Sequence, residues 1–108
     1  MNSMLKKIMT LAIALVAMAA SAQVKPGVET LRDGGFTQLQ GKRVGLITNP
    51  SGVDNDLVST IDILAAAPGV KLTALYSPEH GVRGDIAAGE RVDTYTDPKT
   101  GVTVYSLY

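Results

Sequence analysis

Residues 76–84 hold more side chains capable of chemistry than any other short stretch of the chain. They include a carboxylate, Glu79, the single histidine, His80, and a guanidinium, Arg83. Pro78 restricts the backbone, so a tight turn would direct the Glu79 carboxyl group, which in a partly dry cleft suits a general acid. Arg83 could clamp an anion. The alternatives are that Glu79 accepts backbone hydrogen bonds in the turn, that His80 is structural, and that Arg83 is a solvated charge.

Two strands and a helix are predicted to position this loop. Residues 43–48 and 70–76 are short apolar runs, and the first does not alternate, as expected of a strand covered on both faces. Between them, residues 57–67 have apolar positions at helical spacing, with Asp56 or Ser59 as the N-cap and a Pro-Gly pair as the stop. The sequence therefore predicts a right-handed strand-helix-strand unit with parallel strands.

Weaker patterns flank this unit. Residues 28–32 predict a helical turn closed by glycines, residues 85–89 a second helical turn, and residues 91–95 a short extended piece. Residues 97–101 predict a β-turn that leads into a third strand at residues 102–105. The predicted fold class is α/β, a Rossmann-like parallel sheet of which the chain holds the N-terminal part.

Ligands of open parallel α/β sheets bind at the carboxyl ends of the strands. Three polar segments are predicted at that edge, at residues 48–52, 77–84 and 106–108. Asn49 in the first segment could hydrogen-bond a hydroxyl or an amide, although asparagine before proline also starts turns. Tyr105 and Tyr108 could stack on a sugar ring or pack at the rim of the core. The same segments contribute Ser51 and Ser106.

The first 22 residues have the pattern of a secretory signal peptide. Lys6 and Lys7 precede an apolar run at residues 8–20, and residues 20–22 form an A-x-A cleavage site. The run of 13 residues is short of the roughly 20 that span a bilayer. We therefore expect an exported protein, periplasmic or secreted, with no stable membrane anchor after cleavage and a mature chain at residues 23–108.

Composition excludes several classes of partner and site. The mature 86 residues carry ten acidic and eight basic side chains, which favours neither nucleic acid nor anionic membrane. With no cysteine, the chain has neither a disulfide framework nor a lipid-attachment cysteine. Phosphate-loop, dinucleotide and G-x-S-x-G motifs are missing. One histidine without ligand spacing does not favour a metal site, so no cofactor is predicted.

Four blocks in the sequence, taken together and in order, resemble the exo-β-N-acetylmuramidase family of bacteria, also called NamZ-type and long catalogued as a domain of unknown function. The resemblance extends from about residue 27 to residue 108. The blocks lie at residues 41–54, 77–84, 95–101 and 104–108.

The resemblance implies a secreted glycoside hydrolase that releases N-acetylmuramic acid from the non-reducing ends of peptidoglycan fragments. Family members have a Rossmann-like N-terminal domain and a C-terminal domain with the cleft between them, so residues 23–108 would be a partial catalytic domain with its C-terminal partner missing. Glu79 matches the family's proposed catalytic residue. The residues expected to bind the substrate are Asn49, Ser51, His80, Arg83, Tyr105 and Ser106.

Glycosidases generally use two carboxyl groups, and the sequence offers one convincing candidate. We therefore expect the second group elsewhere, an inactive fragment on its own, and an open choice between retention and inversion. One alternative is a non-catalytic periplasmic module that binds muropeptides. Another is a truncated product without a stable fold. The oligomeric state stays open.

Overall fold

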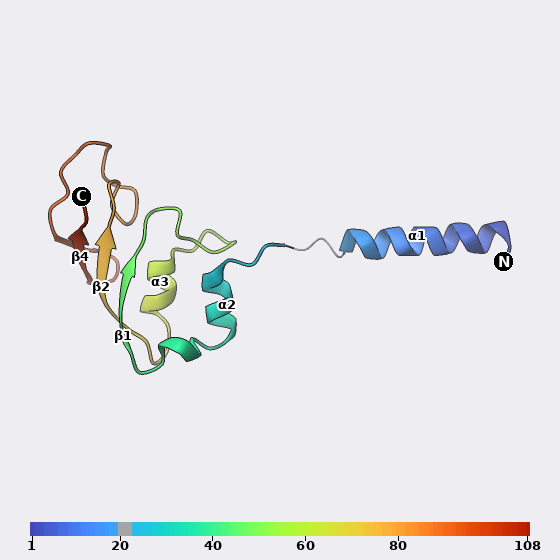
Figure 1. Ribbon diagram of the computed structural model, residues 1–108, viewed down its shortest axis with the longest axis horizontal. Helices are drawn as coiled ribbons and strands as arrows, with labels where there is room; N and C mark the ends of the chain where they lie inside the picture. Colours follow the sequence, from blue (N-terminus) through green and yellow to red (C-terminus); the bar gives the residue numbers. More distant parts are fainter. Residues whose placement is uncertain (20–22) are drawn as a thin grey trace.

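The computed structural model describes residues 1–19 and 23–108. Helix α1 (Ser3–Ala19) comes first and is drawn apart from the α/β unit in Figure 1. In the described ranges, no helix combines the length and apolar character needed to cross a membrane. The expected cleavage site at residues 20–22 lies outside the described residues.

A four-stranded sheet forms the centre of the α/β unit (Figure 1). Its strands are β1 (Arg43–Ile47), β2 (Lys71–Ser77), β3 (Tyr95–Thr96) and β4 (Thr103–Ser106), in the order β1-β2-β4-β3. Strand β2 is parallel to both β1 and β4, whereas β3 is antiparallel to β4. The predicted α/β class with a mostly parallel sheet is confirmed.

Helix α3 (Thr60–Ala65) connects β1 to β2. Ser59, one of the two predicted caps, is the N-cap. Its side chain accepts a hydrogen bond from the Ile61 backbone N–H. With Ser59 rather than Asp56 as the cap, the helix starts at Thr60 and not at Leu57. Leu57 has a left-handed φ of 63° and is 80% exposed, because the buried Asp54 carboxylate binds the backbone N–H groups of residues 56 and 58 and holds this segment as a loop.

Two apolar clusters form the core. The first joins Phe36, Leu64 and Ala67 to side chains of α2 (Gly27–Asp33), which confirms the helical turn predicted there, and to Leu39 of the 3-10 helix η1 (Thr37–Leu39). The second consists of four buried side chains from α3, β2, the loop after β2 and β4. Its members are Ile61, Leu75, Val82 and Val104.

The first strand is not covered on both faces, so that prediction is wrong for the described chain. Arg43, Gly45 and Ile47 alternate with half-buried residues along β1, and Ile47 is 68% exposed. The reason is that α3 and α2 supply apolar side chains to one face, whereas no described helix covers the other. Leu46, on the covered face, contacts both clusters.

The segment after the second strand is largely irregular. The helical turn predicted at residues 85–89 is wrong, because this stretch contains only a turn in which the Glu90 N–H donates to the Ala87 carbonyl at 3.2 Å. The turn predicted at residues 97–101 is confirmed, and it joins β3 to β4. It is closed by a bond from the Gly101 N–H to the Asp97 carbonyl at 2.8 Å, one residue wider than the β-turn expected.

Candidate functional site

A pocket of about 560 Å³ opens at the carboxyl ends of β1 and β2. The loops that build it follow these strands and lie at the same end of the sheet in Figure 1. Since the strands are parallel, their carboxyl ends meet at one edge, which is where the sequence placed the site. The lining residues are Asn49, Pro50, Pro78, Glu79, His80, Gly84 and Ile86.

Glu79 is the one carboxylate among these lining residues. It is half-buried and lies within a turn at residues 78–81, where the buried Ser77 hydroxyl donates to the Pro78 carbonyl at 2.9 Å. The Gly81 N–H donates to the same carbonyl at 3.2 Å and closes the turn. No hydrogen bond joins the Glu79 carboxylate to the part of the chain that the structure describes. Its side chain is therefore available to a ligand, rather than being an acceptor that stabilises the turn.

His80 and Asn49 flank the carboxylate from two different loops. The exposed His80 ring places Nδ1 at 3.4 Å from the Ile86 carbonyl, so this side chain also helps to hold the outer wall. Asn49 Oδ1 accepts hydrogen bonds from the Ser51 backbone N–H at 3.2 Å and from its hydroxyl at 2.8 Å. Asn49 is thus a turn residue as well as a pocket residue, and Ser51 acts on the pocket through Asn49 rather than by lining it.

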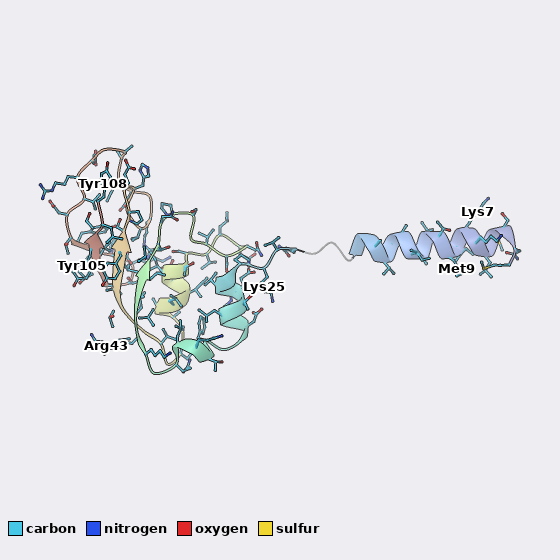
Figure 2. The ribbon with its side chains drawn as sticks, in the orientation of Figure 1. Lys7, Met9, Lys25, Arg43, Tyr105 and Tyr108 are labelled. Carbon is cyan, nitrogen blue, oxygen red and sulfur yellow. The ribbon has the colours of Figure 1, made fainter. Side chains whose placement is uncertain are left out.

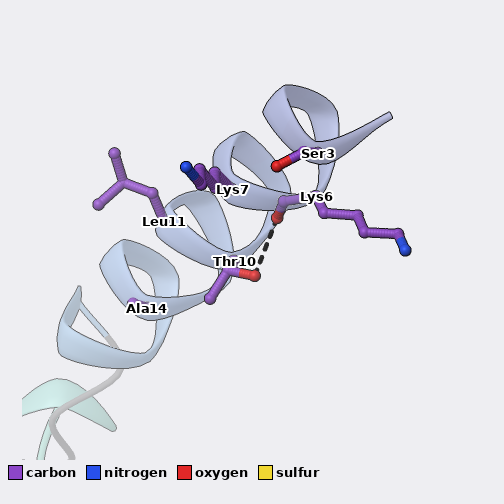
Figure 3. Close-up of a pocket in the computed structure, with 6 residues that line it drawn as sticks. All are labelled: Ser3, Lys6, Lys7, Thr10, Leu11 and Ala14. Atoms are coloured by element: carbon purple, nitrogen blue, oxygen red, sulfur yellow. Dashed lines mark hydrogen bonds between the residues drawn. The ribbon is translucent and has the colours of Figure 1, made fainter. Parts of the chain in front are cut away.

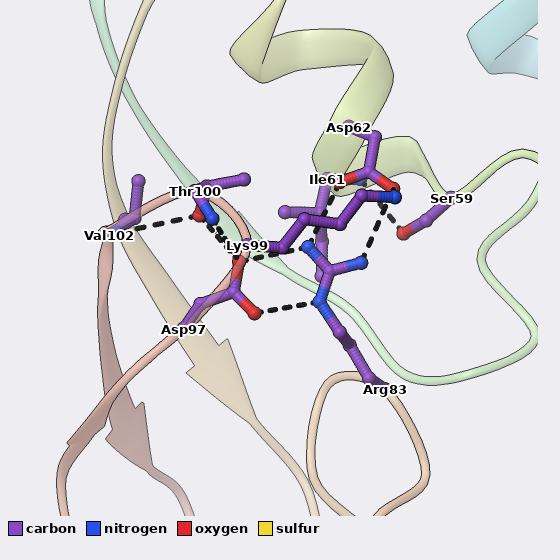
Figure 4. Close-up of polar contacts among 8 residues, drawn as sticks. All are labelled: Ser59, Ile61, Asp62, Arg83, Asp97, Lys99, Thr100 and Val102. Atoms are coloured by element: carbon purple, nitrogen blue, oxygen red, sulfur yellow. Dashed lines mark hydrogen bonds and ion pairs between the residues drawn. The ribbon is translucent and has the colours of Figure 1, made fainter.

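Arg83 lies outside the pocket lining, although the sequence placed it among the substrate-binding groups. Figure 4 shows its guanidinium between two carboxylates. Nε and Nη2 donate to Asp97 Oδ1 and Oδ2 at 2.7 and 2.8 Å, and Nη2 and Nη1 donate to Asp62 Oδ1 and Oδ2 at 2.9 and 3.3 Å. Two bidentate pairs neutralise the positive charge, so an anion clamp at Arg83 does not fit this arrangement.

The charged groups around Arg83 shift one another's pKa values. The hydrogen bonds from Arg83 lower the pKa of Asp97 to about 2, although burial of that carboxyl opposes the change. Arg83 likewise lowers the pKa of Asp62, helped by Lys99, whose Nζ lies 2.7 Å from Asp62 Oδ2. The Asp97 and Asp62 carboxylates in turn raise the pKa of Arg83. We define the Arg83 cluster as Arg83, Asp62, Asp97, Lys99 and Thr100.

The third polar segment, residues 106–108, does not line the pocket. It lies beside the loop of Glu79, by which we mean residues 78–84 after β2. The Leu107 N–H donates to the Ser77 carbonyl at 2.9 Å, which fixes this segment against the end of β2. Tyr105 stacks on Tyr76 with ring centroids 5.6 Å apart, and the Ser106 hydroxyl donates to the Tyr108 carbonyl at 3.0 Å. Figure 2 labels Tyr105 and Tyr108 at this end of the unit. These side chains reach no lining position in the described structure.

Other hollows do not resemble a site. The one in Figure 3, of about 610 Å³, runs along the flank of the exposed helix α1 and has no facing wall from a second element. A smaller one of about 320 Å³ lies between α2 and α3, with Arg32 already bound to Asp54 at 3.0 Å. Within residues 1–19 and 23–108, no three His, Cys, Asp or Glu side chains gather as a metal ion requires.

Gly84 closes the pocket against the other loop. Its φ is +80°, and a Cβ there would lie 2.9 Å from Pro50 Cγ. Gly89 has nearly the same φ, +79°, but nothing within 4 Å of such a Cβ. We expect Gly89→Ala to cost about 1 kcal/mol of unfolding free energy from backbone strain alone. We expect Gly84→Ala to cost about 3 kcal/mol, because the contact with Pro50 is added. Urea unfolding of both variants measures the difference, and equal losses would contradict the contact.

Sequence reasoning missed part of this arrangement. Pro50, Gly84 and Ile86 were not singled out as pocket walls, and only their places in polar loops hinted at it. Asp62 and Asp97 were not linked to Arg83, since they lie 21 and 14 residues away along the chain. Both carboxylates occupy ordinary positions, one on a helix and one in a turn, so the sequence carried no signal of the cluster.

The fold and the pocket together define an α/β protein with a mostly parallel sheet and a carboxylate-bearing pocket at the carboxyl edge. Residues 44–108 match the family model described as "Exo-beta-N-acetylmuramidase NamZ, N-terminal". This chain belongs to the NamZ family.

Two relatives agree with this placement. The chain is 57% identical over 90 residues to the peptidoglycan β-N-acetylmuramidase NamZ of Bacillus subtilis (strain 168), covering 83% of this chain and 22% of that protein. It is also similar to the crystal structure of a DUF1343 family protein from Bacteroides fragilis NCTC 9343, with a TM-score of 0.68 and 61% identity, covering 78% of this chain and 20% of that one. The chain thus spans about a fifth of the length of these relatives.

Proposed function

We propose that this chain forms the acid-bearing wall of the active site of an exo-β-N-acetylmuramidase, which releases N-acetylmuramic acid from the non-reducing ends of peptidoglycan fragments. The observation that carries the proposal is a half-buried Glu79 carboxylate, without a hydrogen-bond partner in the described chain, in a pocket at the carboxyl edge of parallel strands. The name of the Bacillus subtilis relative supports the substrate class.

Glu79 acts as the general acid in this proposal. Its carboxyl O–H donates a proton to the bridging glycosidic oxygen while the bond from that oxygen to the anomeric carbon breaks. Asn49 holds an N-acetyl or hydroxyl group of the sugar, and the exposed His80 side chain contributes a second polar contact from the loop of Glu79. Pro50, Pro78 and Ile86 supply apolar side chains to the pocket wall around Glu79.

A second carboxylate completes the reaction as nucleophile or base. The pocket lining supplies Glu79 alone, and the chain spans 22% of the Bacillus subtilis relative. We propose that the second group comes from a further domain of a protein of that length, across a cleft from Glu79. The distance between the two carboxyl groups would then decide between retention and inversion of the anomeric configuration.

The proposed setting is cell-wall turnover outside the cytoplasm. Lys6, Lys7 and the apolar residues of α1 have the order of charges and apolar residues found in a signal peptide. Export to the periplasm or the medium would bring the protein to peptidoglycan fragments.

The test is incubation of the full-length protein with muropeptides that end in N-acetylmuramic acid, followed by mass spectrometry. Release of the free sugar is expected. Fragments that end in N-acetylglucosamine are the matched control and should stay intact. Retention of the muropeptides on the protein without any release would show a binding module instead of an enzyme. A transplant gives a second measurement. Residues 23–108 are exchanged for the matching segment of the Bacillus subtilis relative, and the hybrid protein should still release the sugar.

A further inference from the structure

The Arg83 cluster joins three separate elements around the loop of Glu79. Asp62 belongs to α3, Arg83 to the loop after β2, and Asp97, Lys99 and Thr100 to the hairpin between β3 and β4 (Figure 4). The Asp97 side chain is fully buried, and it also accepts a hydrogen bond from the Thr100 N–H at 3.0 Å. Arg83 is therefore the one side chain of the loop that contacts both a helix and a hairpin through charged groups.

The loop of Glu79 is held on both sides of the turn that carries the carboxylate. Before the turn, the fully buried Ser77 belongs to β2. After it, Val82 is 2% exposed in the second apolar cluster. Arg83 follows directly with its four hydrogen bonds, and Gly84 then packs on Pro50 of the opposite pocket wall. The residue directly after Arg83, Gly84, therefore lines the pocket and lies against Pro50 of the opposite wall.

The charges around Arg83 favour a positioning role over the binding of a substrate anion. One guanidinium faces two carboxylates, and Lys99 adds a second positive charge at Asp62. A substrate anion would meet these two carboxylates on its way to Arg83, so binding there would be repulsive. Bidentate pairs require the planar fork of arginine, and a lysine cannot reproduce that geometry.

We propose that Arg83 is a positioning residue: it anchors the loop of Glu79 to α3 and to the β3–β4 hairpin, and so sets the place of the catalytic carboxylate without touching the substrate. The inference rests on the proposed function for its catalytic consequence. Its structural consequence, the order of residues 79–84, stands independently of any activity. A misplacement of about 1 Å at a reacting group is enough to cost about a hundredfold in rate.

Kinetics of the full-length protein on muropeptides give the first arm. Arg83→Lys is expected to lower kcat by about 10 to 100-fold with KM unchanged within about twofold. Asp97→Asn should lower kcat in the same way, and the double variant should lose no more than the worse single variant, because the two groups act as one unit. Arg91→Lys is the matched control, since Arg91 is exposed and its one ion pair among the described residues is with the exposed Asp93 at 3.4 Å. A rise in KM with kcat unchanged in Arg83→Lys, and no effect of Asp97→Asn, would show substrate binding and overturn the proposal.

Hydrogen–deuterium exchange of the same proteins gives the second arm, which needs no activity. The amides of residues 79–84 should exchange at least about tenfold faster in Arg83→Lys, whereas those of β1 and β2 should be unchanged. Lysine retains a positive charge beside the buried Asp97, which favours a folded variant. If the unsubstituted protein releases no sugar, the proposed function fails, and this arm alone judges the anchoring. Unchanged exchange at residues 79–84 would overturn it.

Discussion

Glu79→Gln is expected to lower sugar release by the full-length protein about a thousandfold while leaving the fold intact. Glutamine has nearly the same shape but no acidic proton to give to the glycosidic oxygen, and general acid catalysis contributes about 10² to 10⁴-fold in rate. The fold should tolerate the change, because the Glu79 carboxylate is bonded to no group of the described chain and is only half-buried.

The measurement is the initial rate of N-acetylmuramic acid release, together with the urea midpoint of each protein. Glu90→Gln is the matched control: Glu90 is exposed, lies outside the pocket, and undergoes the same chemical change. Its rate should equal that of the unsubstituted protein. A Glu79→Gln variant with more than about a tenth of the original rate would exclude Glu79 as the acid, since general acids typically contribute at least about a hundredfold.

Asp97→Asn is expected to cost about 3 kcal/mol of unfolding free energy at pH 7, because it removes one charge of a buried ion pair. Asp97 is completely buried and accepts hydrogen bonds from Arg83 and from Thr100, so the substitution leaves these donors poorly matched. Arg83 keeps its second carboxylate, Asp62, at 2.9 Å, which limits the loss.

This cost should depend on pH, with a sign that follows from the pKa of Asp97. The pKa is lowered from 3.8 to about 2 in the folded protein by the Arg83 hydrogen bonds. A lowered carboxyl pKa adds stability that is fully present above pH 3.8 and is lost as the pH falls toward 2. The lost part amounts to about 2 kcal/mol. The difference between the original protein and Asp97→Asn should therefore shrink as the pH falls from 5 to 3.

Urea unfolding at pH 7, 5, 4 and 3, followed by circular dichroism, measures this dependence. Asp93→Asn is the matched control, because Asp93 is exposed and its pair with Arg91 at 3.4 Å is also exposed. Such surface pairs contribute about 0 to 1 kcal/mol, so little change is expected. An Asp97→Asn variant that loses stability toward acid as steeply as the original protein would show that Asp97 is not the group responsible.

The strands and the helix between them were predictable from local patterns. Apolar runs flanked by turn residues predicted β1, β2 and β4 to within about one residue, and Ser59 was recognised as a cap. The sequence left the start of α3 open between Asp56 and Ser59 as caps, because Leu57 has the right spacing for a helix face. The Asp54 side chain accepts hydrogen bonds from the backbone N–H groups two and four residues further along the chain, a contact that apolar periodicity does not reveal.

Part of the pocket was predictable for a topological reason. Carboxyl ends of parallel strands meet at one edge, so Asn49 and Glu79 had to lie on the same side of the sheet, and the structure places both in one pocket. The same rule brought Tyr105 and Ser106 to that edge, yet they do not line the pocket. The rule gives the end of each strand but not the direction in which the side chains beyond it point.

The sequence by itself determined the α/β class, the order of the main elements, the loop that carries Glu79 and the family. These depend on residues that are close together in the chain: apolar runs, caps, turns and short motif blocks. Only the tertiary structure decided which groups Arg83 contacts. Its partners, Asp62 and Asp97, lie far away along the chain, and their carboxylates meet one guanidinium only after the helix and the hairpin have packed against the sheet. Local patterns carry no information about such pairings, because the free energy that selects them comes from packing and burial of the whole unit.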